Sequence, residues 1–127
     1  NFTHLIFMNS LVIFDMIGVL TTEPHLVSVT IRNLLPELDI TKIKENYEQY
    51  KVGEIINFQF WQNLGIKNPE NIENTLIDQI KLREEVPQLL ESLKDKVTLA
   101  ILSNIPKEWG NSIIKKFKLT QYFDRVL

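Results

Sequence analysis

The sequence predicts an α/β protein in which helices flank a parallel sheet and a helical segment is inserted after the first strand. Two short apolar runs, residues 11–14 and 97–102, each lead directly into polar residues, and residues 124–127 resemble the start of a third strand. Continuous runs of β-branched and aliphatic residues favour strands that are buried on both faces, as in parallel sheets. Helical patterns separate the runs, which is typical of parallel folds with right-handed crossovers.

The composition is that of an ordinary globular domain. The chain has 127 residues, of which 44% are hydrophobic and 24% charged, and its formal net charge is −2. This balance disfavours nucleic acid or an anionic membrane surface as the main partner. The chain contains no cysteine, so it holds no disulfide or thiolate metal site, and we expect a cytoplasmic protein. The apolar stretch over residues 5–14 is interrupted by Asn9 and Ser10 and is too short to span a membrane.

Between the first two strands the sequence shows helical patterns only. The helices that we expect there cover residues 22–35, 41–52, 58–64 and 69–80. Thr22 and Asn57 suit the N-caps of the first and third helices, with Pro24 in the first turn of the first, and Gly65 suits the end of the third. The expected aromatic centre comprises Tyr47, Tyr50, Phe58, Phe60 and Trp61. Residues 22–80 therefore form an expected helical subdomain.

The rest of the chain forms the predicted core, which comprises residues 1–21 and 81–127. A helix that begins at Val86 precedes the second strand, and a helix over residues 106–117 follows it. The third strand is the last that the pattern predicts, so the expected sheet is cut short. A short sheet leaves an unpaired edge and an uncovered apolar face, which favour association. We therefore expect the sheet edge to support a homodimer.

Polar residues follow two neighbouring strands of this sheet. Asp15 ends the first strand and Gly18 lets the chain turn after it, whereas Ser103 and Asn104 follow the second. The carboxyl ends of parallel strands border the crevice where ligands bind. A hydroxyl and the amides at the start of the next helix favour an anionic oxygen. A carboxylate facing that anion is repelled unless a cation lies between them, so the pattern predicts Mg²⁺ beside Asp15.

Each of these features alone also has an ordinary structural explanation. Asp15 suits a turn, and Ser103 and Asn104 suit the N-cap of the helix that follows them. The combination in one chain favours a site, in which Asp15 attacks phosphorus and forms an aspartyl-phosphate.

With these motifs the chain resembles the haloacid dehalogenase-like hydrolase superfamily, most of whose members are Mg²⁺-dependent phosphatases. Residues 12–20 (VIFDMIGVL) resemble the first motif of the family, and residues 99–104 (LAILSN) resemble the second. The helical segment resembles the cap of the subgroup that inserts it after the first motif. The resemblance covers nearly the whole chain and implies a Rossmann-like core with an inserted α-helical cap.

The resemblance also implies a role for each matching position. Asp15 matches the nucleophile and a Mg²⁺ ligand, and the position of Ile17 matches a residue whose backbone carbonyl binds the metal. Ser103 and Asn104 match the phosphate-binding pair. The implied cofactor is Mg²⁺, and the implied substrate is a small phosphorylated metabolite.

Ile17 is the main departure from the family pattern, because the phosphatases carry there the acid that acts as general acid and base. An isoleucine side chain cannot transfer a proton, and general acid–base catalysis is worth roughly 10²–10⁴ in rate. The lysine of the third motif and the acidic metal ligands of the fourth would fall after Leu127 and cannot be assigned here. We therefore expect a phosphatase-type hydrolase that is impaired in this chain.

Other interpretations stay open. The dehalogenases and phosphonate-cleaving members of the family also lack an acid at this position, although isoleucine is not their usual residue. A non-catalytic interaction or regulatory module on the same fold is a further alternative, as is an altered version of a longer active protein.

Overall fold

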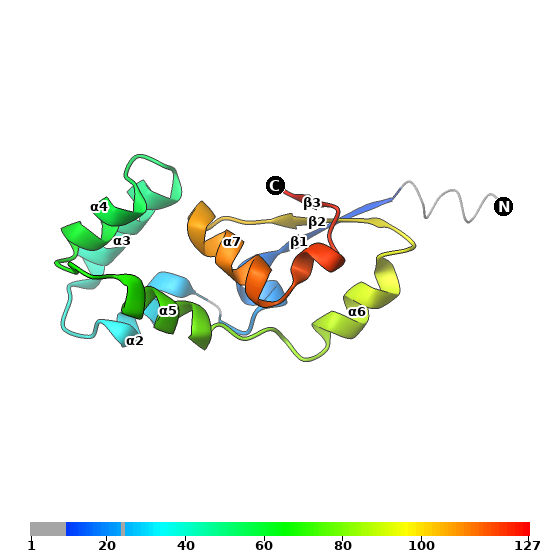
Figure 1. Ribbon diagram of the computed structural model, residues 1–127, viewed down its shortest axis with the longest axis horizontal. Coiled ribbons are helices and arrows are strands. Elements are labelled where there is room, and N and C mark those ends of the chain that lie inside the picture. The colour runs from blue at the N-terminus through cyan, green and yellow to red at the C-terminus, as the bar shows by residue number, and fades with distance from the viewer. Residues whose placement is uncertain (1–9, 24) are drawn as a thin grey trace.

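Three parallel strands form the sheet of this protein. The computed structural model describes residues 10–23 and 25–127, and its strands are β1 (Leu11–Asp15), β2 (Thr98–Leu102) and β3 (Arg125–Val126). They lie in the order β1-β2-β3, and both pairs are parallel. Asp15 is the register partner of Leu102, so the residues that follow β2 lie beside the carboxyl end of β1. The predicted α/β fold is confirmed (Figure 1).

Helices occupy the chain between the strands. Between β1 and β2 lie η1 (Met16–Leu20), η2 (Leu26–Ile31), α2 (Arg32–Leu34), α3 (Ile40–Lys51), α4 (Asn57–Asn63), α5 (Glu70–Gln79) and α6 (Val86–Leu93). Between β2 and β3 lie α7 (Lys107–Lys116) and the 3-10 turn η3 (Leu119–Gln121). In Figure 1, α2 to α5 gather at one end of the elongated molecule, and α6, α7 and the sheet form the other. We call η2 and α2 to α5 the helical region. None of the described helices is long and apolar enough to cross a membrane.

The first helix of the helical region begins later than the sequence predicts. η2 starts at Leu26, and no side chain caps it. The expected cap, Thr22, instead donates from its hydroxyl to Glu23 Oε2 over 3.2 Å. The backbone of Thr22 is already bonded elsewhere, which explains why the helix does not begin there. Thr22 N donates to Lys81 O over 2.9 Å, in the segment that returns to the sheet. The predicted place of Pro24 lies outside the described residues.

The start of α4 also differs from the prediction, whereas its end agrees. Asn57 is not the N-cap, because α4 already includes it and Gln59 Oε1 accepts a hydrogen bond from Ile56 N over 2.9 Å. The side chain of Asn57 donates to Tyr50 Oη over 2.8 Å instead. Gly65 follows the helix with a φ of 82°, the left-handed conformation that commonly closes a helix.

The two connections between the sheet and the helical region run side by side. Thr21 and Leu82 form an isolated antiparallel bridge, and Arg83 N donates to Leu20 O over 2.9 Å. These contacts lie at the boundaries that the sequence suggests, after residue 21 and before residue 81. The division into a core and an inserted domain stays a prediction.

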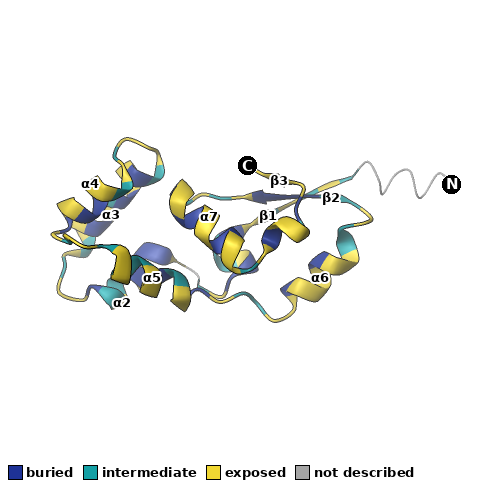
Figure 2. Ribbon diagram, in the orientation of Figure 1, coloured by how far each residue is buried: buried dark blue, intermediate teal, exposed yellow. Residues whose placement is uncertain are grey.

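One buried apolar cluster extends from the sheet into the helical region. Trp109 of α7 is 2% exposed, and its ring lies 5.3 to 6.1 Å from the ring centroids of Tyr47, Tyr50, Phe60 and Trp61. Figure 2 colours the inward faces of α3 and α7 as buried. Phe58 is 56% exposed, so its predicted place in the aromatic centre is wrong.

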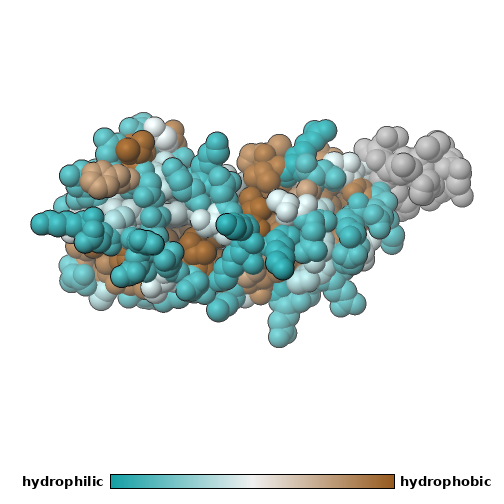
Figure 3. Space-filling view, viewed as in Figure 1, coloured by the Kyte–Doolittle hydropathy of each residue, from teal (hydrophilic) through white to brown (hydrophobic). Residues whose placement is uncertain are grey.

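One face of the sheet is only partly covered. Leu11 and Ile13 are each 50% exposed, and Leu102 is 49% exposed. The prediction that the first strand is buried on both faces is therefore wrong for β1, because alternate side chains of a strand point to opposite faces and only one set is covered. Figure 3 shows further apolar side chains at the surface near the C-terminus, where Val126 and Leu127 are 52% and 56% exposed.

Candidate functional site

Asp15 lies at the carboxyl end of β1, where the strand passes into the loop that follows. Its Oδ1 accepts a hydrogen bond from Met16 N over 2.8 Å, and the residue is exposed. Within the described part of the chain, this is the one hydrogen bond that the carboxylate makes. The backbone thus orients one oxygen and leaves the other for a ligand.

The segment η1 after Asp15 is a loop rather than a regular helix, because Ile17 and Gly18 have non-helical backbone angles, and contacts from two sides hold it. Gly18 adopts a φ of 83°, which glycine reaches without steric cost. Its amide donates to Thr21 Oγ1 over 3.2 Å, and its carbonyl accepts from Arg83 Nη2 over 3.1 Å. Thr21 is buried, and Arg83 comes from the connection that returns from the helical region. These contacts fix the backbone around Ile17, which is extended, with φ −74° and ψ 125°.

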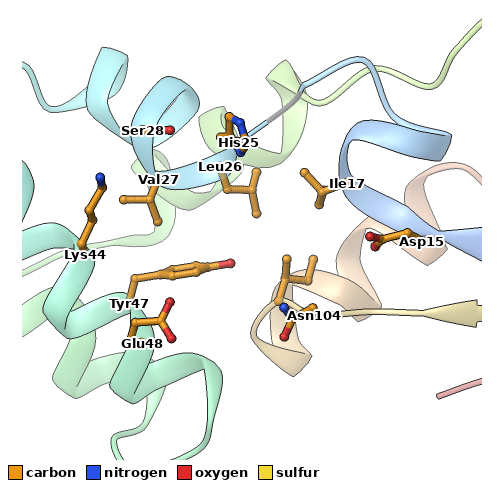
Figure 4. A pocket seen from close by; sticks show the side chains of 11 residues that line it. Asp15, Ile17, His25, Leu26, Val27, Ser28, Lys44, Tyr47, Glu48 and Asn104 are labelled. Atoms are coloured by element: carbon orange, nitrogen blue, oxygen red, sulfur yellow. The ribbon is translucent and has the colours of Figure 1, made fainter.

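A cavity of about 580 Å³ lies between the end of β1 and the helical region (Figure 4). The residues that line it are Asp15, Ile17, His25, Leu26, Val27, Ser28, Lys44, Tyr47, Glu48, Asn104 and Ile105. The ends of β1 and β2 supply one wall, through Asp15, Ile17, Asn104 and Ile105. The start of η2 and one face of α3 supply the other wall.

The structure brings three of the four predicted site residues to this cavity. Asp15, Ile17 and Asn104 line it, whereas Ser103 does not. The hydroxyl of Ser103 lies against α7, since a Cβ placed on Gly110 would stand 3.1 Å from Ser103 Oγ. The phosphate-binding and metal-binding roles of these four residues stay predictions.

Sequence patterns do not single out the polar residues that the helical region contributes. Lys44, Tyr47 and Glu48 all line the cavity from α3. Their spacing indicates only that they share one face of the helix, because residues three and four apart are neighbours on a helix surface. The sequence does not reveal where that face points, because this depends on how α3 packs against the rest of the molecule.

Tyr47 differs from the other polar residues of the helical region at the cavity because it is buried, with 8% of its surface exposed. Figure 4 shows its ring extending from α3 across the cavity, toward the side where Asn104 and Asp15 lie. Burial, with a smaller effect of the nearby Glu48, raises the pKa of Tyr47 far above its ordinary value. The hydroxyl therefore keeps its proton and can donate a hydrogen bond.

Two oxygen donors beside the cavity are of the kind that magnesium binds. The Asp15 carboxylate and the backbone carbonyl of Ile17 are oxygen ligands, and Mg²⁺ usually keeps several waters besides one or two carboxylates. The described residues contain no group of three or more His, Cys, Asp or Glu side chains that could hold a metal ion. A Mg²⁺ ion here would therefore depend on Asp15, the loop backbone and water.

The parallel sheet, the aspartate at the end of its first strand and the adjoining cavity define a Rossmann-like α/β protein with a cavity at the carboxyl ends of its strands, where ligands bind in open parallel sheets. The sequence profile of the haloacid dehalogenase-like hydrolases matches residues 12–127. The chain therefore belongs to this family of hydrolases, as the resemblance of its motifs implied. A comparison with curated proteins finds no significant match.

Solved structures of the family share the fold. A family enzyme from Bacteroides thetaiotaomicron, solved as a magnesium complex, is 19% identical with a TM-score of 0.67. L-2-haloacid dehalogenase from Xanthobacter autotrophicus, with chloropropionic acid covalently bound, is 17% identical with a TM-score of 0.55. A protein described as a predicted phosphatase from Clostridium acetobutylicum is 18% identical with a TM-score of 0.60. Each match covers 94% of this chain but only 66%, 56% and 61% of the respective solved chain.

Proposed function

We propose that this protein is a hydrolase of the phosphatase type that uses Asp15 as its nucleophile. The observation that carries the proposal is the position of Asp15, at the end of β1 and in the wall of a cavity of about 580 Å³ that it shares with Asn104. Membership of the haloacid dehalogenase-like hydrolases supports the hydrolase class. A cavity of this size suits a small phosphorylated metabolite.

The reaction has two steps on the same carboxylate. In the first, an oxygen of Asp15 attacks the phosphorus of the substrate, the bond from phosphorus to the ester oxygen breaks, and that oxygen leaves with the bonding electrons. In the second, a water oxygen attacks the aspartyl-phosphate, Asp15 leaves as a carboxylate, and inorganic phosphate is released. The hydrogen bond from Met16 N holds one carboxylate oxygen, which leaves the other free to attack. The amide of Asn104 faces the same cavity and would donate to a phosphoryl oxygen.

The loop after β1 would also supply the cofactor site that the family commonly uses. A Mg²⁺ ion held by the Asp15 carboxylate and the Ile17 carbonyl would reduce the repulsion between the nucleophile and the phosphoryl oxygens. The hydrogen bonds of Gly18 to Thr21 and Arg83 hold the loop backbone in place. Asp15 and the carbonyl of Ile17, two positions later, would then be the protein's ligands to the ion, and water would supply the others.

We further propose that Ile17 impairs the reaction. A leaving alkoxide needs a proton, and the attacking water must lose one. The Ile17 side chain can do neither, although it lines the cavity next to Asp15. General acid–base catalysis contributes roughly 10²–10⁴ in rate, so turnover should be slow by about that factor.

A steady-state assay with p-nitrophenyl phosphate and Mg²⁺, run at high protein concentration, tests both parts. We expect phosphate release well below the rate of about 1 s⁻¹ that marks the lower end of ordinary enzymes, and we expect Asp15→Asn to abolish it. Rapid turnover that Asp15→Asn abolishes would contradict the impairment. Turnover that Asp15→Asn leaves unchanged would contradict the role of Asp15.

A dehalogenase is the second candidate, and Ile17 is the observation that favours it. When Asp15 attacks a carbon that bears a halogen, the halide leaves with the bonding electrons and needs no proton, so an acid at position 17 is unnecessary. Water then hydrolyses the ester on Asp15 and releases a hydroxy acid. A screen of 2-haloacids for halide release separates this candidate from the phosphatase, because only one of the two substrate classes should turn over.

The helical region would act as a cap in either reaction. It supplies the wall of the cavity opposite Asp15, through residues of η2 and α3 such as Lys44 and Glu48. We propose that this wall encloses the substrate while the ends of the strands supply the chemistry. Exchange of Lys44 and Glu48 for alanine should then change the preference among substrates more than the rate with the best one.

A second copy of the chain is the partner that the sheet suggests. Leu11, Ile13 and Leu102 are half exposed on neighbouring strands, and among the described residues β1 pairs with a strand on one side only. We propose that two copies meet at this edge of the sheet, which would serve a regulatory module as well as an enzyme. Light scattering should show a dimer, and a monomer at micromolar concentration would contradict the proposal.

A further inference from the structure

Tyr47 is a largely buried residue of the helical region that presents its hydroxyl to the cavity at Asp15. The other polar residues on this wall of the cavity, His25 just before η2 and Ser28, Lys44 and Glu48 within the helical region, are exposed. Tyr47 is 8% exposed, and its hydroxyl end points into the cavity (Figure 4). A ligand in the cavity would therefore meet a phenol whose ring is packed in the protein and whose hydroxyl is open to the cavity.

Packing against α7 fixes the position of the Tyr47 ring relative to the ends of the strands. It packs against Trp109 of α7, with ring centroids 5.9 Å apart and planes inclined by 31°. Trp109 is fixed in turn, because its Nε1 donates to Glu73 Oε2 over 2.6 Å. Helix α7 begins three residues after Asn104, so the contact with Trp109 positions the phenol relative to the polar end of β2.

The Tyr47 hydroxyl is available to a ligand. None of the hydrogen bonds among the described residues involves it. Tyr50, one turn further along α3, is the opposite case: its hydroxyl donates to Glu108 Oε2 over 3.0 Å and accepts from Asn57 Nδ2 over 2.8 Å. Because the hydroxyl opens into the cavity and no described side chain bonds it, an oxygen of a bound substrate can replace water as its acceptor.

We infer that Tyr47 contacts the substrate and donates a hydrogen bond to the oxygen that leaves phosphorus when Asp15 attacks. This inference rests on the proposed phosphatase reaction and names its substrate class. Because Ile17 cannot supply a proton, the leaving oxygen departs as an anion, and a phenol that keeps its own proton stabilises this anion by donation alone. Such a site suits leaving groups that are weak bases, as in the phosphate monoesters of phenols.

The walls of the cavity agree with an aromatic leaving group. Ile17, Leu26, Val27 and Ile105 line it, and their side chains offer apolar surface to a ring. The substrate class is therefore an aryl phosphate, with its phosphoryl group at Asp15 and its ester oxygen at Tyr47.

Calorimetric titration of the Asp15→Asn protein with phenyl phosphate and with inorganic phosphate, both in the presence of Mg²⁺, tests this inference without turnover. The same titrations are repeated with the double variant Asp15→Asn, Tyr47→Phe, which keeps the aromatic ring and lacks only the hydroxyl oxygen. We expect phenyl phosphate to bind about 3- to 10-fold more weakly, as for the loss of one hydrogen bond, and inorganic phosphate to bind equally well. In the active protein, Tyr47→Phe should lower kcat/KM more for phenyl phosphate than for p-nitrophenyl phosphate, whose leaving group needs less stabilisation.

Tyr50→Phe is the matched control. It removes a hydroxyl from the same helix, but this hydroxyl donates to Glu108, and Tyr50 does not line the cavity. It should change the affinity of neither ligand. If Tyr47→Phe weakens both ligands equally, or neither, Tyr47 does not contact the leaving oxygen and the inference is wrong, while the proposed phosphatase function stands. If inorganic phosphate binds neither these variants nor the chain with Asp15 intact, the proposed function itself is wrong, and the inference with it.

Discussion

The indole nitrogen of Trp109 donates a 2.6 Å hydrogen bond to Glu73 Oε2, and this contact joins α7 to α5. Asn57 Nδ2 donates to the same carboxylate oxygen over 3.0 Å, and Tyr50 Oη donates to Glu108 on α7 over 3.0 Å. The helix that follows the polar end of β2 is therefore hydrogen-bonded to two helices of the helical region, α5 and α3, and Asn57 joins α4 to α5. The relative position of the two cavity walls depends on this network and on the aromatic rings around it.

Truncation of Trp109 should destabilise the protein strongly. Its side chain is 2% exposed and contacts four aromatic rings, so Trp109→Ala leaves a cavity and removes one of the two hydrogen bonds to Glu73 Oε2. We expect the free energy of unfolding to fall by about 3–5 kcal/mol, measured by urea denaturation. Phe58→Ala is the control, because Phe58 is 56% exposed and should change the stability by no more than about 0.5 kcal/mol. Equal effects of the two variants would show that α7 is not fastened in this way.

Replacing Ile17 with an acid should restore proton transfer at the site. If the phosphatase proposal is right, Ile17→Asp should raise kcat for an alkyl phosphate by about 10²–10⁴, because the leaving alkoxide then receives a proton. The gain should be smaller for p-nitrophenyl phosphate, whose leaving group is stable as an anion. Ile17→Asn has a similar size and no acid, so it should give no gain. No difference between the two variants would contradict the proposed cause of the impairment.

The strand and helix order could be predicted from the sequence because its signals are local. The apolar runs before Asp15 and Ser103 marked two parallel strands correctly, and a glycine marked the end of α4 at position 65. Exposure was harder to predict. Phe58 and Ile13 are apolar residues that the pattern placed inside, yet both are at least half exposed. Burial depends on what packs against a face, and neighbouring elements are not encoded in the local pattern.

The site was predictable in part for the same reason. Asp15 and Asn104 follow strands that the pattern identifies, and the parallel topology brings them to one cavity. Tyr47 could not be predicted as a cavity residue, because its place depends on contact with Trp109, which lies 62 positions away in the sequence. Aromatic packing between distant helices has no local signal.

Asn104 should matter more than Ser103 for phosphate binding. Both match the phosphate-binding pair of the family, but only Asn104 lines the cavity, whereas Ser103 Oγ lies beside Gly110. We expect Asn104→Ala to weaken the binding of inorganic phosphate by about tenfold, as for the loss of one hydrogen bond to a charged group. Ser103→Ala should weaken it by less than about threefold, measured by the same calorimetric titration. A larger effect of Ser103→Ala would mean that the serine turns toward the ligand when phosphate binds.

The protein should lose stability at alkaline pH, in part through Tyr50. Burial is the main cause that raises the pKa of Tyr50 above its ordinary value of 10.0, and the hydrogen bond and charge of Glu108 and the charge of Glu73 add to it, against the bond from Asn57. The unfolded chain ionises this phenol near pH 10, whereas the folded chain does not, so the unfolded state binds fewer protons above pH 10 and stability falls as the pH rises. The full contribution of Tyr50 is present below pH 10 and is lost as the pH rises toward its folded pKa.

Urea denaturation at a series of pH values measures this loss. Above pH 10 the free energy of unfolding of the wild-type chain should fall more steeply than that of Tyr50→Phe, by at most about 1.4 kcal/mol for each pH unit. Between pH 7 and 9 the two curves should run parallel, because the phenol is neutral in both the folded and the unfolded chain. Curves that stay parallel above pH 10 would mean that Tyr50 ionises as readily in the folded protein as in the unfolded one, which would contradict the raised pKa.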